Sequence, residues 1–252
     1  MAVGGDVDYD RTGGGYAAQR RPDPVLAHRI RQALGPVRTV LNVGAGTGSY
    51  EPQDCYVLAV EPSAVMRAQR RPGAGLAIEA FAEALPLDDD SVDAAMAVAT
   101  VHQWRDPAKG LAELRRVARG PVVVAAFDGP ALSRWWLNDY APELIAAEQR
   151  RYPGIEAIVD ALGGQVSVET VPIAIDCVDG VTEAFYARPE RLLEPAVRGA
   201  QSSWGFVAPE VEPRFVAALS ADLASGAWDE RYGHWRRMPT YDGSRRLVIS
   251  RP

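Results

Sequence analysis

The chain has 252 residues, of which 24% are charged and 47% hydrophobic, a composition typical of a soluble globular protein. Its formal net charge of −6 argues against a nucleic-acid partner. No apolar run approaches the roughly 20 residues of a membrane span, and the N-terminus lacks the apolar core of a signal peptide. The two cysteines have neither metal nor redox spacing. We therefore expect a cytoplasmic protein that has no metal site and binds neither nucleic acid nor a membrane.

The first predicted element is a helix that follows a glycine-rich segment, residues 1–22, which we expect to be flexible. Asp23 suits a helix N-cap, and Pro24 suits the first helical position. The helix has an apolar face and ends at Gly35-Pro36; the apolar positions are Val25, Leu26, Ile30 and Leu34.

Two short apolar runs, Thr39–Val43 and Tyr56–Val60, follow as predicted strands. The first stops at three glycines, Gly44, Gly46 and Gly48. The second ends at Glu61. Glycine has no Cβ to keep a ligand away from the backbone, and a carboxylate at the end of the next strand can accept hydrogen bonds from two ribose hydroxyls. The pattern predicts a pocket for an adenosine-containing cofactor.

The spacing of the glycines bears on which cofactor binds. A dinucleotide fold uses G-x-G-x-x-G, which would place the third glycine where this chain has Ser49. The third glycine comes one residue earlier, so the pattern disfavours a nicotinamide cofactor.

The next predicted elements alternate between helix and strand, which indicates βαβ units and a mainly parallel sheet. Asp106-Pro107 suits the start of a helix. The strands are apolar runs without alternation, which indicates burial on both faces of the sheet. The predicted elements are a helix over 63–70, a strand over 76–80, a strand over 92–98, a helix from 107 and a strand over 121–127.

Beyond Asp128 the composition changes, because aromatic residues become frequent. We expect several helices here, with two strands, 165–175 and 246–250, forming an antiparallel pair at the edge of the sheet. The expected organisation is a cofactor-binding core over 23–128 and a substrate-binding helical cap plus the last two strands over 129–252. Most of the tryptophans are expected to fill the core of this cap.

Four segments together resemble class I S-adenosylmethionine (SAM)-dependent methyltransferases of the small-molecule type. They are the N-x-G-x-G-x-G run at 42–48, the acidic Glu61, the FAEALP segment at 81–86 and the H-Q-W segment at 102–104. The resemblance implies an α/β fold: a Rossmann-like, mainly parallel seven-stranded sheet with helices on both faces and a helical C-terminal cap. The chain departs from the family at Asn42 and Phe81, where acidic residues are usual.

The resemblance also implies a cofactor, SAM, with S-adenosylhomocysteine (SAH) as its product, and roles for individual residues. Glu61 would bind the ribose, and Pro62 would pass beneath the adenine edge. Backbone groups and a carboxylate would complete the site. The implied residues are Gly44, Ala45 and Gly46 at the methionine moiety, Ala82 and Glu83 at the adenine, and Ala99 beside the cofactor.

The segment from Tyr16 to Arg20 resembles a Y-x-x-x-R segment that folds over SAM in this family. Arg20 would then pair with the methionine carboxylate, and Tyr16 would lie near the cationic sulfur. We accordingly expect residues 1–22 to close over the cofactor. The alternative is a solvated arginine and a tyrosine that packs on the surface.

His102 follows the predicted strand over 92–98, at the sheet edge where open α/β sheets bind ligands. An imidazole there is suited to accept a proton near neutral pH. The alternative is that His102 only packs or hydrogen-bonds beside the cofactor.

The function expected from these features is methyl transfer from SAM to an oxygen or nitrogen of a small metabolite. One alternative is a SAM-binding protein that transfers no methyl group, with a structural or cyclase-like role. A nicotinamide-dependent oxidoreductase is the other. Nothing in the sequence indicates an oligomeric state.

Overall fold

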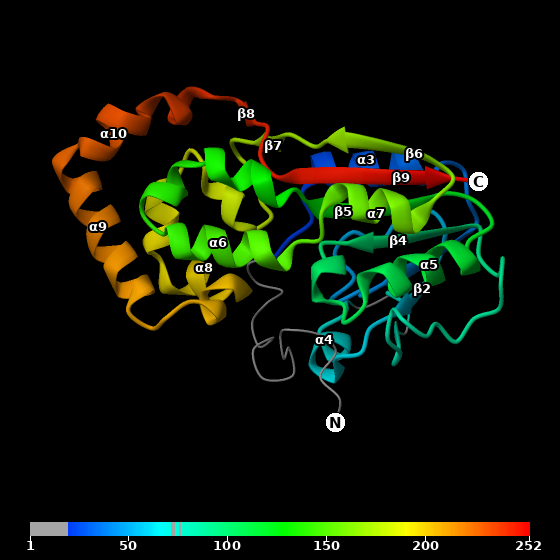
Figure 1. Ribbon diagram of the computed structural model, residues 1–252. Helices are drawn as coiled ribbons and strands as arrows, with labels where there is room; N and C mark the ends of the chain where they lie inside the picture. Colours follow the sequence, from blue (N-terminus) through cyan, green and yellow to red (C-terminus); the bar gives the residue numbers. More distant parts are fainter. Residues whose placement is uncertain (1–19, 72–73, 76) are drawn as a thin grey trace.

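The computed structural model describes residues 20–71, 74–75 and 77–252, and a seven-stranded sheet forms its centre (Figure 1). The strand order is β3-β2-β1-β4-β5-β9-β6. Neighbours from β3 to β5 are parallel, whereas β9 is antiparallel to both β5 and β6. The strands are β1 (Thr39–Val43), β2 (Tyr56–Val60), β3 (Ala77–Ile78), β4 (Ala94–Val98), β5 (Val122–Phe127), β6 (Gln165–Thr170) and β9 (Arg245–Arg251). The predicted Rossmann-like sheet is confirmed.

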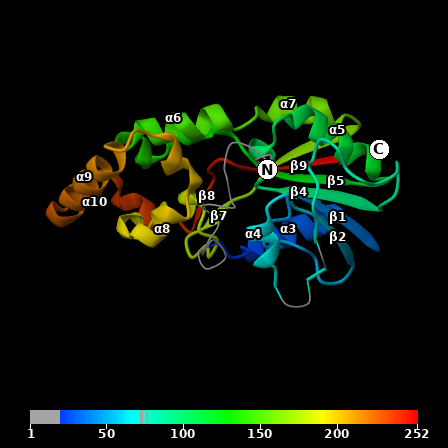
Figure 2. The same cartoon turned by 90° about the horizontal axis from the view of Figure 1, so that it is seen from below.

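Helices cover both faces of the sheet, and Figure 2 shows α3 (Pro24–Leu34) on the opposite side from α5 (Pro107–Val117) and α7 (Ile155–Leu162). Successive strand residues point to opposite faces. In β5, Val123 and Ala125 pack with the residues of α3, whereas Val122 and Val124 pack with those of α5 and α7. This double burial explains why the strands are continuous apolar runs.

Two of the predicted helix starts are confirmed by their caps. The Asp23 carboxylate accepts a hydrogen bond from the Val25 amide at 3.1 Å. The Asp106 carboxylate accepts one from the Lys109 amide at 3.0 Å. A proline follows each aspartate at the first helical position, where a missing N–H costs nothing.

The predicted strand over 165–175 is wrong in its length, because the structure divides it. β6 ends at Thr170, and β7 (Ile173–Ala174) pairs with β8 (Thr240–Tyr241) in a separate two-stranded sheet. Pro172 lies between them and has no N–H to donate to a ladder. The strand predicted over 76–80 is also shorter, since β3 is only Ala77–Ile78 among the residues described. The helix predicted over 63–70 is α4 (Ala64–Ala68), with Ser63 as its N-cap.

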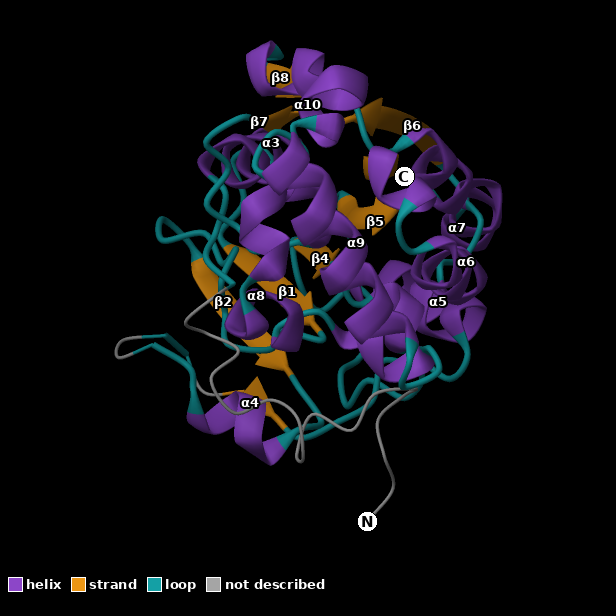
Figure 3. Ribbon diagram, turned by 90° about the vertical axis from the view of Figure 1, so that its left-hand side faces the viewer, coloured by secondary structure: helices purple, strands orange, loops and turns teal. Residues whose placement is uncertain are grey.

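The remaining helices form a cap beyond the carboxyl ends of β4 and β5 (Figures 1 and 3). They are α6 (Pro142–Arg151), α8 (Pro195–Gly199), α9 (Val211–Ser225) and α10 (Ala227–Tyr232), joined by short 3-10 helices. The cap has a hydrophobic cluster separate from the two clusters of the sheet. Four of the five tryptophans of the cap are buried there, as expected: Trp135, Trp136, Trp228 and Trp235. In the part of the chain that the structure describes, no helix has the length and apolar character needed to cross a membrane.

A buried ionic cluster connects the core to the cap. Arg245, the first residue of β9, forms an ion pair with Asp23 at 2.5 Å and lies 4.0 Å from Asp179 in the cap. The exposed fractions of these three residues are 3%, 1% and 3%. Asp179 also accepts hydrogen bonds from Arg20, at 2.6 Å, and from the hydroxyl of Tyr50, at 2.7 Å. The Arg245 guanidinium thus stabilises two buried carboxylates, one at the start of α3 and one in the cap.

We expect Arg245→Met to lower the free energy of unfolding by about 3–5 kcal/mol, because removing one partner leaves buried carboxylates uncompensated. Urea unfolding measures this loss. Arg214→Met is the matched control, since Arg214 and its partner Glu143 are about half exposed and such pairs contribute at most about 1 kcal/mol. Equal losses for the two variants would show that the cluster is not a structural centre.

Candidate active site

The three glycines after β1 form a turn that other residues fit poorly. Gly44, Gly46 and Gly48 have φ values of 65°, 51° and 78°, in the left-handed region that favours glycine. At Gly44 a Cβ atom would lie 2.1 Å from the Thr100 hydroxyl oxygen, so the absent side chain also makes room for the end of β4. The sequence between β1 and β2 therefore brings bare backbone to the carboxyl edge of the sheet.

Glu61 lies directly beside this turn. One of its carboxylate oxygens accepts a hydrogen bond from the Gly46 amide at 2.8 Å, and the other accepts one from the Ser63 amide at 2.9 Å. Burial raises the pKa of Glu61, and the two amide hydrogen bonds oppose that rise. A carboxylate has about four acceptor positions, so two stay available for ribose hydroxyls.

A buried ion pair between Glu51 and Arg70 lies beside the turn, next to Gly48. Arg70 donates to both carboxylate oxygens of Glu51 at 2.9 Å, and the Asn42 amide donates to Glu51 at 3.1 Å. The side chains of Glu51 and Arg70 are 4% and 6% exposed. Asn42 stands where an acidic residue is usual in the family. In this chain its side chain instead donates a hydrogen bond to the carboxylate of Glu51. No motif in the sequence connects Glu51 with Arg70.

The segment after β4 connects the glycine turn with a cavity. Thr100 contacts Gly44, while its neighbours Ala99 and His102 line the cavity. Ala99 has a φ of 53°, an uncommon conformation for a residue with a side chain that is often found at functional sites.

The segment at 81–86 lies beside the start of α5. Ala82 is buried, and Glu83 accepts hydrogen bonds from the amides of Arg105 and Asp106 at 2.8 and 3.1 Å. The Arg105 guanidinium lies 5.4 Å from the centre of the Phe81 ring. The adenine contacts suggested for Ala82 and Glu83 stay predictions.

Arg20 lines the same cavity, and its guanidinium pairs with Asp179 at 2.6 Å. This partner was not expected from the sequence. Tyr16 lies outside the described residues, as does most of the segment 1–22 that was expected to close over the cofactor.

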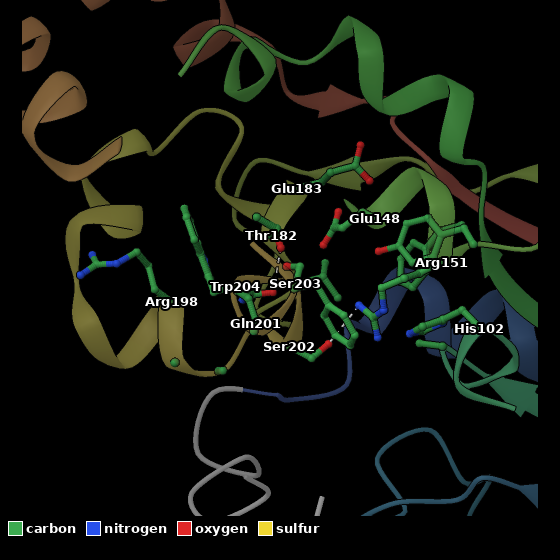
Figure 4. Close-up of a pocket in the computed structure, with 18 of the residues that line it drawn as sticks. His102, Glu148, Arg151, Thr182, Glu183, Arg198, Gln201, Ser202, Ser203 and Trp204 are labelled. Carbon is green, nitrogen blue, oxygen red and sulfur yellow. Dashed lines mark hydrogen bonds between the residues drawn. The ribbon is translucent and has the colours of Figure 1, made fainter. Parts of the chain in front are cut away.

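The cavity has a volume of about 520 Å³ and lies between the carboxyl ends of β4 and β5 and the cap (Figure 4). Such a volume lies in the usual range for small-molecule sites. Its wall combines carboxylates, guanidinium groups, hydroxyls and aromatic rings. Side chains that line it include Phe127, Glu148, Arg151, Tyr152, Glu183 and Gln201.

His102 lies in an aromatic and positively charged part of the wall. Its ring centre is 5.2 Å from that of Tyr152 and 6.0 Å from that of Phe127. Burial, together with the charges of Arg151 and Arg20, lowers the pKa of His102 to about 3. The imidazole is therefore neutral near pH 7, and its Nε2 atom forms a hydrogen bond with the Gln103 side chain at 3.3 Å.

Glu148, on α6, is the cavity residue that sequence reasoning missed. Burial raises its pKa to about 7; the charge of Glu183 acts in the same direction, and Ser203, Arg151 and Tyr152 oppose it. A sequence feature could have revealed Glu148, because its carboxylate lies on the apolar face of a helix. It follows one turn after Leu144 and Ile145, which are buried in the cap cluster.

The comparisons with known proteins agree with this geometry. Residues 41–125 match a family model described as a methyltransferase domain. The chain carries a class I SAM-dependent methyltransferase domain. Uncharacterised methyltransferases of Mycobacterium bovis and Mycobacterium tuberculosis are 40% identical to it over 88 residues. That match covers 32% of this chain and only 36% of each relative.

Solved structures extend the likeness to the cap. A putative methyltransferase from an antibiotic biosynthesis pathway of Anabaena variabilis is 29% identical, with a TM-score of 0.87 over 92% of this chain and 98% of the other. The phosphoethanolamine N-methyltransferase 2 of Haemonchus contortus, solved with SAM, shares the fold at 15% identity. Its TM-score is 0.55 over 96% of this chain and 57% of that one. The likeness at 15% identity shows a shared fold, and the family match over residues 41–125 indicates SAM as the cofactor of this domain.

We expect Glu148 to make stability depend on pH. Its folded pKa of about 7 lies above the ordinary value of 4.5, so the folded state keeps the proton longer than the unfolded chain. The free energy of unfolding should fall as pH rises from about 4.5 to about 7, by up to about 3 kcal/mol. Glu148→Gln should remove this loss in urea unfolding across that pH range.

The matched control is Glu143→Gln on the same helix, whose carboxylate pairs with Arg214 at an exposed site. It should leave the fall between pH 4.5 and 7 in place. A Glu148→Gln profile parallel to that of the unmodified protein would show that this carboxyl titrates as an ordinary one.

Proposed function

We propose that the protein transfers a methyl group from SAM to an oxygen or nitrogen of a small metabolite. The observation that carries this proposal is the continuity of the two sites through the segment after β4. Thr100 touches the glycine turn, and Ala99 and His102 line the cavity. A methyl group presented at the turn would therefore face the cavity, where a small acceptor fits.

The residues that would hold SAM follow the ends of four strands, β1 to β4. Backbone groups of Gly44, Ala45 and Gly46 would receive the methionine moiety, and Glu61 the ribose, with Pro62 beneath the adenine edge. Ala82, Glu83 and Ala99 would complete the site. Support comes from the bare turn and from the unused acceptor positions of Glu61. When bound, SAM supplies a methyl group on a sulfonium whose leaving thioether is neutral.

The protein's part in this reaction is chiefly orientation, since holding two reactants in line can lower a barrier by several kcal/mol. His102 is the proposed base. Its low pKa makes it a weak base, but an acceptor oxygen becomes strongly acidic as the methyl group arrives. A neutral imidazole can then take the proton.

One feature of the turn disfavours the dinucleotide alternative. Between β1 and β2, the described residues 44–55 contain no helix. Pyrophosphate sites of dinucleotide folds use the amides and dipole of a helix at this place. The segment therefore suits an adenosine-containing cofactor without a pyrophosphate.

We expect Glu61→Gln to weaken SAH binding by about 1.5–3 kcal/mol, the range for hydrogen bonds to a charged group. Glutamine retains the size of the side chain and one acceptor oxygen, so it can keep one of the two amide hydrogen bonds that Glu61 accepts. Isothermal titration with SAH measures the change. Glu79→Gln, at a carboxylate that is 72% exposed near the same strand ends, is the control and should bind SAH normally. An unchanged affinity in Glu61→Gln would remove Glu61 from the site.

We expect His102→Ala to lower the rate of methyl transfer by roughly 10²–10⁴-fold and to leave SAH affinity unchanged. Because the pKa of His102 is about 3, the unmodified enzyme should show no inflection from this residue near pH 6.5. Single-turnover rates across pH test both points. Near-full turnover by the variant would make His102 a packing residue and leave orientation as the source of catalysis.

A further inference from the structure

The wall of the cavity contains one carboxylate whose position neither packing nor ion pairing explains. Glu148 is 7% exposed and lines the cavity from α6. Among the described residues, no arginine, lysine or histidine forms an ion pair with it; the Ser203 and Tyr152 hydroxyls and the charge of Arg151 only partly favour its ionised form. The buried carboxylates Asp23 and Asp179, in contrast, each form an ion pair. A buried carboxyl without an ion-pair partner retains its proton more readily, so a cationic ligand would stabilise its charged form.

The charges around Glu148 make that part of the cavity negative. Glu183 lies beside it in Figure 4, and its carboxylate accepts hydrogen bonds from the Ser244 amide at 3.0 and 3.1 Å and from the Ser244 hydroxyl. Glu183 is therefore committed to holding the start of β9. It still adds negative charge, which disfavours ionisation of Glu148.

The guanidinium groups of the cavity have other contacts. Arg198 pairs with Glu212 at 2.6 Å and donates to the Leu192 carbonyl. Arg151 lies 4.1 Å above the Phe206 ring and donates to the Ser202 hydroxyl. Arg20 pairs with Asp179. The charge of Arg151 favours the ionised form of Glu148, but none of the three guanidinium groups forms an ion pair with this carboxylate.

Aromatic rings complete the surroundings of Glu148. Tyr152 stacks on Phe127 with ring centres 5.0 Å apart, and Trp204 lines the cavity from the cap. Ring faces attract cations, especially where water is excluded. A buried carboxylate among aromatic rings matches an organic ammonium group in both charge and shape.

We propose that the acceptor is a small molecule that carries a protonated amine, and that Glu148 binds this amine. The inference rests on the proposed function, in that the cavity is taken as the acceptor site of the methyltransferase. In this proposal Glu148 determines substrate selectivity, so that amines bind more tightly than neutral or anionic molecules of the same size. It leaves the transfer step to the groups at the end of β4.

The test uses three probes with one phenyl ring and charges that differ: phenethylamine, phenethyl alcohol and phenylacetate. Each is titrated into the full chain by calorimetry, with and without saturating SAH. We expect the amine to bind about tenfold or more tightly than the alcohol, the effect of a hydrogen bond to a charged group, and phenylacetate to bind most weakly. Glu148→Gln should lower the affinity for the amine to that for the alcohol.

Glu143→Gln, the exposed glutamate of the same helix, is the matched control and should keep the preference for the amine. Equal binding of amine and alcohol by the unmodified protein overturns the proposal, as does a preference that survives in Glu148→Gln or a cavity that binds none of the probes. Failure of SAH to bind is a separate result that counts against the proposed function. The titrations without SAH still decide the role of Glu148 in that case.

Discussion

The guanidinium of Arg245 is the point at which the sheet, the first helix and the cap meet. It neutralises Asp23, which also caps α3, and it lies near Asp179, which holds the hydroxyl of Tyr50. Tyr50 in turn accepts a hydrogen bond from the Asp23 amide and lies two residues after the glycine turn. Because these groups are buried, none can move far without exposing an unpaired charge to an apolar interior. The position of the cap relative to the glycine turn is fixed by this cluster.

A cap fixed in this way allows the cavity wall to hold charges of both signs. Burial, together with the charges of Arg151 and Arg20, keeps His102 neutral, whereas the carboxylates of Glu148 and Glu183 lie near each other (Figure 4). The side chains of Glu148 and Glu183 are buried, so water screens their charges less than it would at the surface. The proposed chemistry depends on this arrangement, because the proton acceptor must stay neutral while the recognition carboxylate becomes charged when the ammonium group binds.

The parts of the molecule that the sequence predicted are those determined by neighbours along the chain. Caps such as Asp23 and Asp106, the apolar strands and the glycine turn with Glu61 all follow from short patterns, and the structure contains them. The division of the strand at Pro172 was also readable, since proline interrupts a ladder, yet the strand was predicted to continue. Ion pairs between distant parts of the chain could not be predicted from short patterns, since 222 positions separate Arg245 from Asp23. The position of Glu148 in the cavity wall could not be predicted from the sequence, because it depends on where α6 lies relative to the ends of β4 and β5.

The order of the strands has a consequence for how the chain folds. β9 is the last strand in the sequence but lies between β5 and β6 in the sheet. Until β9 forms, β6 has no strand to pair with, and β5 has an open edge. Arg245, the first residue of β9, also carries the guanidinium that neutralises Asp23. Contacts between segments so far apart close large loops and form slowly. The sheet and the cap should therefore become stable together, late in folding, and a ribosome-bound chain that lacks β9 would expose the unpaired backbone edge of β5 and leave β6 without a partner strand.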